Sequence, residues 1–335
     1  MKAVMVDEFG PLETATVRDV PDPQPGAGEV VIALGAADVN FPDILVMEGA
    51  YQFKPPLPFS PGKAGAGIVE AIGDGVTRFK QGDRVAVEVE YGAYAEKVLA
   101  VEHLCYPLPD GISFTAAAAL CLVYQTAHFA LVERAGFKAG DTVLVLGASG
   151  GVGLAAVQLA KALGAKTVIA GVRALSKAQA VRDGGADLVV DLSVETLRDD
   201  LRDQVNVATG GHGADVVIDP VGGAAHAAAL RAMAWRGRMV IVGFASGDIP
   251  QIRSNYLLVK NIAVSGLQWS DYRDRDPDAV AAVQAEIFAL CKSGKLVPHI
   301  SRVFAMDDFA TALGMLKAGQ AEGKIVLSFG AGEGE

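Results

Sequence analysis

The chain has 335 residues, of which 51% are hydrophobic and 20% are charged, and its formal net charge is −10. This balance fits a globular protein of two domains with a large core. The acidic charge argues against a general nucleic-acid binder, and no apolar run is long enough to predict a membrane span. Three distant cysteines and an N-terminus unlike a signal peptide predict a cytoplasmic protein.

Residues 1 to about 120 have the pattern of short strands separated by turns. Gly and Pro clusters separate the strand-like runs, and the prolines between Pro55 and Pro61 predict a stiff loop. We expect a β-rich domain here, with strands at Lys2–Val6, Val30–Leu34, Gly67–Ile72 and Arg84–Val89.

From residue 141 to about 265, strand and helix patterns alternate. Such alternation predicts a doubly wound parallel sheet with helices on both faces, as in a Rossmann domain. The expected strands are Thr142–Leu146, Thr167–Ala170, Leu188–Asp191, Val216–Asp219, Arg238–Val242 and Ile262–Leu267. The expected helices cover 154–163, 176–183 and 194–209. The apolar strand Ile262–Leu267 should be outermost, and its open edge invites pairing with a second copy.

The last part of the chain is expected to fold back onto the first domain. Its pattern predicts helices at Asp278–Ser293 and Asp307–Ala318 and a strand at Lys324–Phe329. The predicted domains are therefore residues 1–122 with 266–335, and residues 123–265. The tail from Gly330 to Glu335 is expected to be disordered.

The run that ends at Leu146 leads into a Gly-rich turn of the form A-x-G-x-x-G. Ala148 would lie at the tight exit from the strand, Gly150 would let a pyrophosphate approach the backbone, and Gly153 would let the next helix pack closely. That helix would offer unpaired N–H groups and the positive end of its dipole to phosphates. The turn predicts a dinucleotide site made of Ala148, Ser149, Gly150, Gly151, Val152 and Gly153.

The end of the second strand of this domain predicts which dinucleotide binds. NAD enzymes carry an acid there, about 20 residues past the fingerprint, which binds the ribose hydroxyls. This chain has Arg173 instead, with Lys177 in the following helix. A carboxylate would repel a 2′-phosphate, whereas Arg and Lys pair with it. We therefore expect NADPH, the alternative being that both residues are ordinary surface cations.

The order and spacing of several motifs resemble the zinc-independent NADPH:quinone oxidoreductases, the zeta-crystallin-like branch of the medium-chain dehydrogenase/reductase superfamily. The resemblance covers residues 1–330 and includes Asp38–Asp43, Gly92–Glu96, Gly147–Gly153, Val217–Gly223 and Gly323–Leu327. It implies an α/β fold in which a Rossmann domain joins a β-rich, GroES-like catalytic domain. It also implies a small-molecule quinone or enone as partner, and a homodimer.

Zinc-dependent relatives carry a Cys near position 40 and Gly-His-Glu at 62–64. This chain has Asn40 and Gly62–Lys63–Ala64 instead, and it lacks the four-cysteine structural zinc loop. Protonated lysine is a poor zinc ligand, so we expect no metal. Many family members carry Glu at the position of Ala64, so a role of that acid does not transfer to this chain.

The resemblance points to three candidate catalytic residues. Tyr51 is the candidate proton donor for the acceptor, and the alternative is an aromatic packing residue in a Pro-rich loop. Asn40 is expected to hydrogen-bond the substrate carbonyl or the nicotinamide ribose. Asp43 more readily fixes that loop than carries out chemistry. Tyr94 and Tyr124 could line the cleft or belong to the core.

Three further residues are cofactor candidates. Thr126 matches a family threonine near the nicotinamide amide. Phe244 follows a strand end past which the cofactor would run. Lys324 falls where relatives often contact the pyrophosphate, and a surface lysine is the alternative.

Three functions are compatible with these motifs. The first is an NADPH-dependent quinone reductase. The second is a reductase of the C=C bond of enones or enoyl thioesters, and the third is a non-catalytic, crystallin-like NADPH-binding protein. Retention of both the turn and the polar residues disfavours the third.

Overall fold

The structure is a computed structural model that describes residues 1–330, so the tail from 331 onward lies outside the described residues. The chain divides into two compact units. Among the described residues, the first comprises Met1–Leu122, Arg275–Lys292 and 300–330, and the second Val123–Asp274 and Ser293–His299. The domain boundaries expected from the sequence remain a prediction, and the compact units differ from them in placing 266–274 and 293–299 in the second unit.

The first unit is built on a seven-stranded sheet with the order β14-β15-β3-β4-β5-β7, in which β6 also pairs with β3. Beside it, β1 and β2 form an antiparallel pair. The strands are β1 (Lys2–Met5), β2 (Thr16–Asp19), β3 (Glu29–Val39), β4 (Ala64–Ile72), β5 (Arg84–Glu88), β6 (Lys97–Val101), β7 (Cys105–Pro107), β14 (Ile300–Ala305) and β15 (Lys324–Ser328). The β-rich first domain predicted from the sequence is confirmed.

One strand pairing in this sheet positions the candidate site. Strand β15 runs antiparallel to β3, with Ile325 opposite Val39 and Val326 opposite Asp38. Lys324 therefore comes next to the end of β3, where Asn40 follows. A strand from the end of the chain thus meets a strand from its beginning.

The helices of the first unit are short except for α10. They are α1 (Phe41–Met47), α2 (Phe114–Ala119), α10 (Pro277–Lys292) and α11 (Phe309–Lys317), with single turns at Leu12–Thr14, Glu102–Leu104 and Met306–Asp308. The sequence patterns did not predict α1, since it has only seven residues. Its proline lies in the first turn, where a missing N–H costs nothing.

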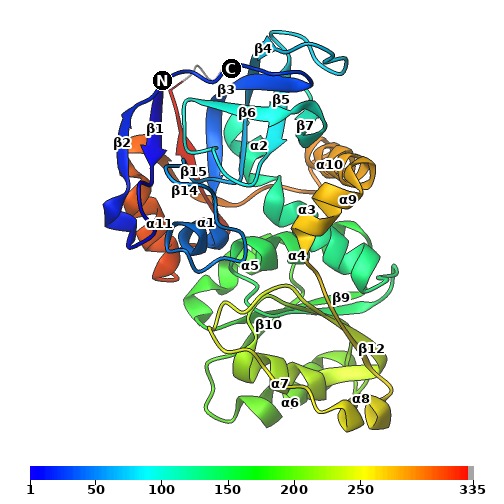
Figure 1. Ribbon diagram of the computed structural model, residues 1–335. Coiled ribbons are helices and arrows are strands. Elements are labelled where there is room, and N and C mark those ends of the chain that lie inside the picture. Colours follow the sequence, from blue (N-terminus) through cyan, green and yellow to red (C-terminus); the bar gives the residue numbers. More distant parts are fainter. Residues whose placement is uncertain (331–335) are drawn as a thin grey trace. The chain divides into compact units, whose positions relative to one another are not determined.

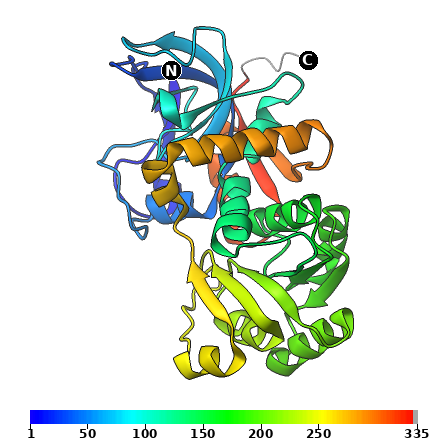
Figure 2. The same ribbon diagram turned by 90° about the vertical axis from the view of Figure 1, so that its right-hand side faces the viewer.

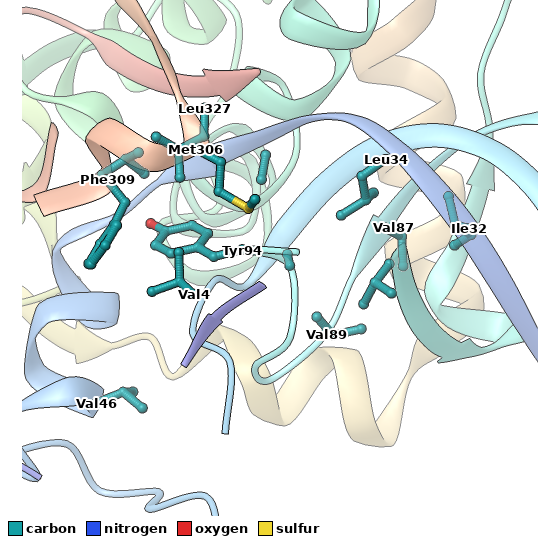
Figure 3. Close-up of a cluster of buried hydrophobic side chains, with 14 of the residues drawn as sticks. Val4, Ile32, Leu34, Val46, Val87, Val89, Tyr94, Met306, Phe309 and Leu327 are labelled. Atoms are coloured by element: carbon teal, nitrogen blue, oxygen red, sulfur yellow. The ribbon is translucent and has the colours of Figure 1, made fainter. Parts of the chain in front are cut away.

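The core of the first unit collects side chains from both ends of the chain. Figure 3 shows Tyr94 between Val4, Met306 and Phe309, with Leu327 nearby. Tyr94 is fully buried, so it belongs to the core, one of the two positions considered for it.

The second unit is a six-stranded sheet with the order β10-β9-β8-β11-β12-β13, and every pairing in it is parallel. Its strands are β8 (Thr142–Val145), β9 (Thr167–Val172), β10 (Leu188–Asp191), β11 (Ala214–Asp219), β12 (Met233–Ile241) and β13 (Ala263–Gly266). This order is that of a doubly wound Rossmann sheet, so the predicted fold class is confirmed. Strand β13 lies at the sheet edge, as predicted (Figure 2).

Helices cover both faces of this sheet. Figure 1 shows α4 (Gly151–Ala162) and α5 (Ala178–Asp183) on one face, and α6 (Leu197–Thr209), α7 (Gly223–Ala232) and α8 (Ser254–Lys260) on the other. The remaining helices are α3 (Leu122–His128), a π-helical stretch at Phe129–Arg134 and α9 (Trp269–Arg275). The sequence patterns did not predict α8 and α9, since each has seven residues. Within residues 1–330, no helix combines the length and the apolar character needed to span a membrane.

Candidate functional site

The predicted cofactor residues Ala148–Gly153 lie together after β8: Ala148–Gly150 lead into α4, and Gly151–Gly153 form its first turn. Ala148 is buried, and its N–H donates to the carbonyl of Gly171 at 2.9 Å. A Cβ atom on Gly153 would lie only 2.2 Å from the carbonyl oxygen of Gly147. Glycine at 153 therefore lets α4 begin directly against the turn, which is the close packing expected of it.

Gly150 differs from Gly153, because the fold itself does not require glycine there. Its φ is −83°, and the nearest atom to an added Cβ would be the Gly147 carbonyl oxygen at 3.5 Å, an ordinary contact. Gly150 is also the N-cap of α4, and no side chain caps this helix. Because the first N–H groups of a helix need acceptors, this end fits an anion such as a pyrophosphate.

Arg173 follows the end of β9 and is exposed. It forms no hydrogen bond or ion pair with another described residue, so its guanidinium is open to a ligand. No carboxylate ends β9, but Asp191 ends the neighbouring β10 opposite Val172. Its carboxylate accepts bonds from the N–H and hydroxyl of Ser193, at 2.8 and 2.6 Å, which lower the pKa of Asp191. Lys177 is half-buried in the turn that precedes α5.

Two buried residues that were not among the predicted site residues order the loop after β11. The carboxylate of Asp219 accepts the N–H groups of Val221 and Gly222, both at 2.9 Å. Its other oxygen lies 2.7 Å from Nδ1 of His226, on α7. The sequence could have pointed to Asp219, because it is an acid at the end of a strand followed by Val-Gly-Gly. Its contact with His226 becomes visible only in the folded structure.

The loop after β12 carries Phe244. Its ring is 39% exposed and lies close to Gly222, and Ala245 donates to the carbonyl of Pro220 at 3.1 Å. Both loops follow carboxyl ends of strands, where ligands bind in sheets of this type. Thr126 is buried in α3. Cofactor contacts of Phe244 and Thr126 stay predictions.

In the first unit, Asn40, Asp38 and Lys324 form one buried group. The ammonium of Lys324 donates to Asp38 Oδ2 at 2.9 Å, to the Val39 carbonyl at 3.0 Å and to Asn40 Oδ1 at 2.6 Å. Asn40 Nδ2 donates to Asp38 Oδ1 at 2.8 Å. The structure thus brings two of the predicted site residues, Asn40 and Lys324, into direct contact.

This group fixes the orientation of the Asn40 amide. Lysine only donates, so it requires the amide oxygen, and a carboxylate only accepts, so Asp38 requires the amide nitrogen. One N–H of Asn40 then remains without an acceptor among residues 1–330. Because an ammonium has three donors, Lys324 has none left for a pyrophosphate in this arrangement. That contact stays a prediction.

Asp43 anchors the start of α1. Its Oδ2 accepts the backbone N–H of Asn40 and the hydroxyl of Tyr94, both at 2.8 Å. Burial, reinforced by the nearby Asp38 carboxylate, raises the pKa of Asp43 to about 7. Burial likewise raises the pKa of Tyr94 well above its usual value. These contacts support the expectation that Asp43 fixes the loop.

Tyr51 lies beside Lys63, a residue that sequence reasoning used only to argue against zinc. Lys63 is 6% exposed, and its Nζ lies 4.8 Å from the centroid of the Tyr51 ring. The same Nζ is 2.5 Å from Oε1 of Glu90. A lysine in an otherwise apolar run before β4 was the available signal.

The donor set in this unit is poor in metal ligands. Among residues 1–330, no group of three or more His, Cys, Asp or Glu side chains could hold a metal ion. Burial raises the pKa of Cys105 to about 12, and that of Cys121 well above its usual value. Both thiols therefore stay protonated and unreactive near neutral pH.

Comparison with known proteins finds similarity over nearly the whole chain. Family models described as "Alcohol dehydrogenase GroES-like domain" and "Zinc-binding dehydrogenase" match residues 26–110 and 151–286. The quinone oxidoreductase-like protein 2 homolog of Nematostella vectensis is 38% identical over 98% of this chain and 88% of its own length. The quinone oxidoreductase of Homo sapiens is 34% identical over 98% and 97%. The structure of Escherichia coli quinone oxidoreductase complexed with NADPH has a TM-score of 0.89 at 29% identity, over 98% and 100%.

The two glycines of the turn should respond differently to alanine. Gly153→Ala places a Cβ 2.2 Å from backbone, so we expect a loss of about 3 kcal/mol in unfolding free energy. Gly150→Ala should change stability by less than about 1 kcal/mol but weaken binding of the expected NADPH about tenfold. Urea denaturation and calorimetric titration measure the two effects. Equal stabilities of the two variants would contradict this assignment.

The buried carboxyl of Asp43 should make stability depend on pH. Its folded pKa is about 7, whereas an unfolded aspartate titrates near 4. The contribution of Asp43 to the free energy of unfolding is therefore fully present below about pH 4 and is lost as the pH rises to about 7. Relative to Asp43→Asn, the unfolding free energy of the wild type should fall by about 4 kcal/mol over this range. Denaturation at several pH values measures the difference, and a flat difference would exclude this account.

Proposed function

Because the chain belongs to the quinone oxidoreductase family of the medium-chain dehydrogenase/reductase superfamily, we propose that it is an NADPH-dependent reductase of quinones or related electron-poor acceptors. The observation that carries this proposal is the Asn40 N–H that has no acceptor among residues 1–330, on an amide whose orientation Lys324 and Asp38 fix. A fixed donor of this kind suits a carbonyl oxygen on which negative charge builds up.

The residues of the second unit fit NADPH. The uncapped N-terminus of α4 would hold the pyrophosphate, and Gly150 leaves space for it. Arg173, with Lys177, would pair with the 2′-phosphate. When bound, NADPH supplies the hydride. The NADPH complex of the Escherichia coli relative supports this choice.

The first unit supplies the groups that act on the acceptor. Reduction of a quinone by a hydride also takes up one proton. In our proposal the Asn40 N–H stabilises the developing oxyanion, and the Tyr51 hydroxyl donates the proton and regains one from water. Asp43 and Tyr94 hold Asn40 in place and carry out no proton transfer.

The proposed reaction uses no metal. At the positions where zinc-dependent relatives carry Cys, His and Glu, this chain offers an amide, an ammonium and a methyl group, at Asn40, Lys63 and Ala64. None of the three is a zinc ligand at neutral pH. Elemental analysis that found one zinc per chain would contradict this part of the proposal.

We also propose a cytoplasmic homodimer formed through β13. This strand lies at the edge of its sheet, and large apolar side chains of the same unit are exposed. They include Trp235 at 70%, on β12, which pairs with β13, and Leu258 at 78% and Val259 at 72%, on α8, the helix that precedes β13 in the chain. An open edge beside exposed apolar groups favours association. Sedimentation of a monomer at micromolar concentration would exclude the dimer.

The wild-type protein should oxidise NADPH in the presence of quinones, and this assay tests the function directly. Absorbance at the nicotinamide band follows the reaction with a quinone panel and, separately, with an enone panel. Turnover with enones alone would overturn quinone reduction in favour of C=C reduction. NADPH binding without turnover in either panel would overturn the enzyme assignment.

Tyr51→Phe should lower kcat with quinones about tenfold or more, because the proton must then come from water, while the Kd for NADPH stays unchanged. Tyr91→Phe is the matched control. Tyr91 is a partly exposed tyrosine of the same unit, whose ring stacks on Phe53. Steady-state kinetics of both variants measure the effect. Unchanged turnover in Tyr51→Phe would remove Tyr51 as the donor.

Arg173→Ala should weaken NADPH binding about tenfold and leave NADH binding unchanged, because only NADPH carries the 2′-phosphate. Lys166→Ala removes an exposed cation of the same unit and serves as the control. Calorimetric titration with both cofactors measures the change. Equal losses for NADPH and NADH would contradict the role of Arg173.

A further inference from the structure

Lys63 places a buried positive charge against the candidate proton donor. Its Nζ lies 4.8 Å from the centroid of the Tyr51 ring, within the range of a cation–π contact. The ammonium also donates to the Glu90 carboxylate at 2.5 Å and to the Glu90 carbonyl at 3.1 Å. Two of its three donors are thus used by one residue, which holds the ammonium beside the ring.

Stability alone does not explain this arrangement. Burying an ammonium is costly even when a carboxylate pairs with it, and apolar side chains of similar volume often replace such pairs without loss of stability. Lys63 is almost fully buried and lies directly before β4, whose first residues are small and apolar. A methionine would fill the same volume without this cost. The buried charge of Lys63 is therefore better explained by a functional role than by stability.

We propose that Lys63 is a positioning residue that acts through Tyr51, holding its ring and stabilising the phenolate that Tyr51 becomes when it gives up its proton. The inference deepens the proposed function and rests on Tyr51 as the donor. In that step the O–H bond of Tyr51 breaks and an O–H bond forms on the acceptor oxygen. The hydride supplies both electrons, and water returns the proton to Tyr51.

The sign of the effect follows from the charged groups around Tyr51. A positive charge within about 4–6 Å favours the ionised form of an acid. Two negative groups oppose Lys63: Glu90, in the segment after β5, and Asp43 on α1, whose own pKa Lys63 lowers. Glu90 is in direct contact with the ammonium, so it screens much of the charge. The net shift that Lys63 causes in the titration midpoint of Tyr51 should therefore lie near the lower end of the range of shifts that a neighbouring charge produces.

Titration of the Tyr51 phenol in the cofactor-free protein tests the inference without any turnover. Carbon-13 at the ζ position of tyrosine reports ionisation by NMR, and the signal lost in Tyr51→Phe identifies Tyr51. In Lys63→Met the titration midpoint should rise by about one pH unit. Lys63→Arg retains the charge, so its midpoint should lie close to that of the wild type.

Glu90→Gln should move the midpoint in the opposite direction. It removes the screening carboxylate and leaves the ammonium, so Tyr51 should ionise at lower pH. A general disturbance of the fold would not give shifts of opposite sign in the two variants. Lys97→Met is the control, because Lys97 pairs with Asp22 and Glu70 elsewhere in the same unit. Its midpoint should equal that of the wild type.

Kinetics then separate this inference from the proposed function. In Lys63→Met, kcat should fall several-fold, and its decline at high pH should move upward with the Tyr51 midpoint. The Kd for NADPH should not change. Midpoints unmoved in both Lys63→Met and Glu90→Gln would overturn the role of Lys63. Full turnover in Tyr51→Phe with the midpoints shifted would instead overturn Tyr51 as donor and leave the coupling intact.

Discussion

The buried ion pair between Lys324 and Asp38 ties the candidate site to the fold of the first unit. The two residues are 286 positions apart, and they meet because β15 pairs with β3. Breaking one half of such a pair would leave a buried charge uncompensated, which is far costlier than losing an exposed pair. The pairing of β15 with β3 therefore also fixes the orientation of the Asn40 amide, because it brings Lys324 to Asn40.

The two buried carboxyl groups at this site, Asp38 and Asp43, have different hydrogen-bond partners. Asp38 is in contact with the Lys324 ammonium and with the Asn40 amide. Asp43 receives only neutral donors, and one of its oxygens has no partner among the described residues. Burial and the neighbouring Asp38 therefore raise the pKa of Asp43. One acid belongs to a charged group, whereas the other acts as a buried anchor.

In the Gly-rich turn of the second unit, one glycine is required by the fold and another is better explained by a ligand. Gly153 is required by the chain itself, since a side chain would collide with the Gly147 carbonyl. A side chain at position 150 would meet no such obstacle. Glycine at this position is therefore better explained by a bound ligand that approaches the backbone. Asp219 and His226 order the neighbouring loop and support the same edge of the sheet.

The sequence by itself determined the elements that depend on neighbouring residues. The alternation of strands and helices, the edge position of β13 and the turn at Gly147–Gly153 follow from local hydrophobic period and glycine spacing. The short helices α1, α8 and α9 were not predicted, because seven residues carry little periodic signal. Asn40 and Tyr51 were named from motif resemblance, which says what a residue is but not what lies beside it.

Only the tertiary structure decided which partners these residues have. Lys324 reaches Asn40 across a strand pairing, Tyr94 reaches Asp43 from another loop, and Lys63 reaches Tyr51 and Glu90. None of these contacts has a spacing that a sequence pattern could reveal, because each joins segments that adjoin only after folding. Amide orientation, carboxyl protonation and the charge beside Tyr51 depend on short distances and burial, and both arise when distant segments pack.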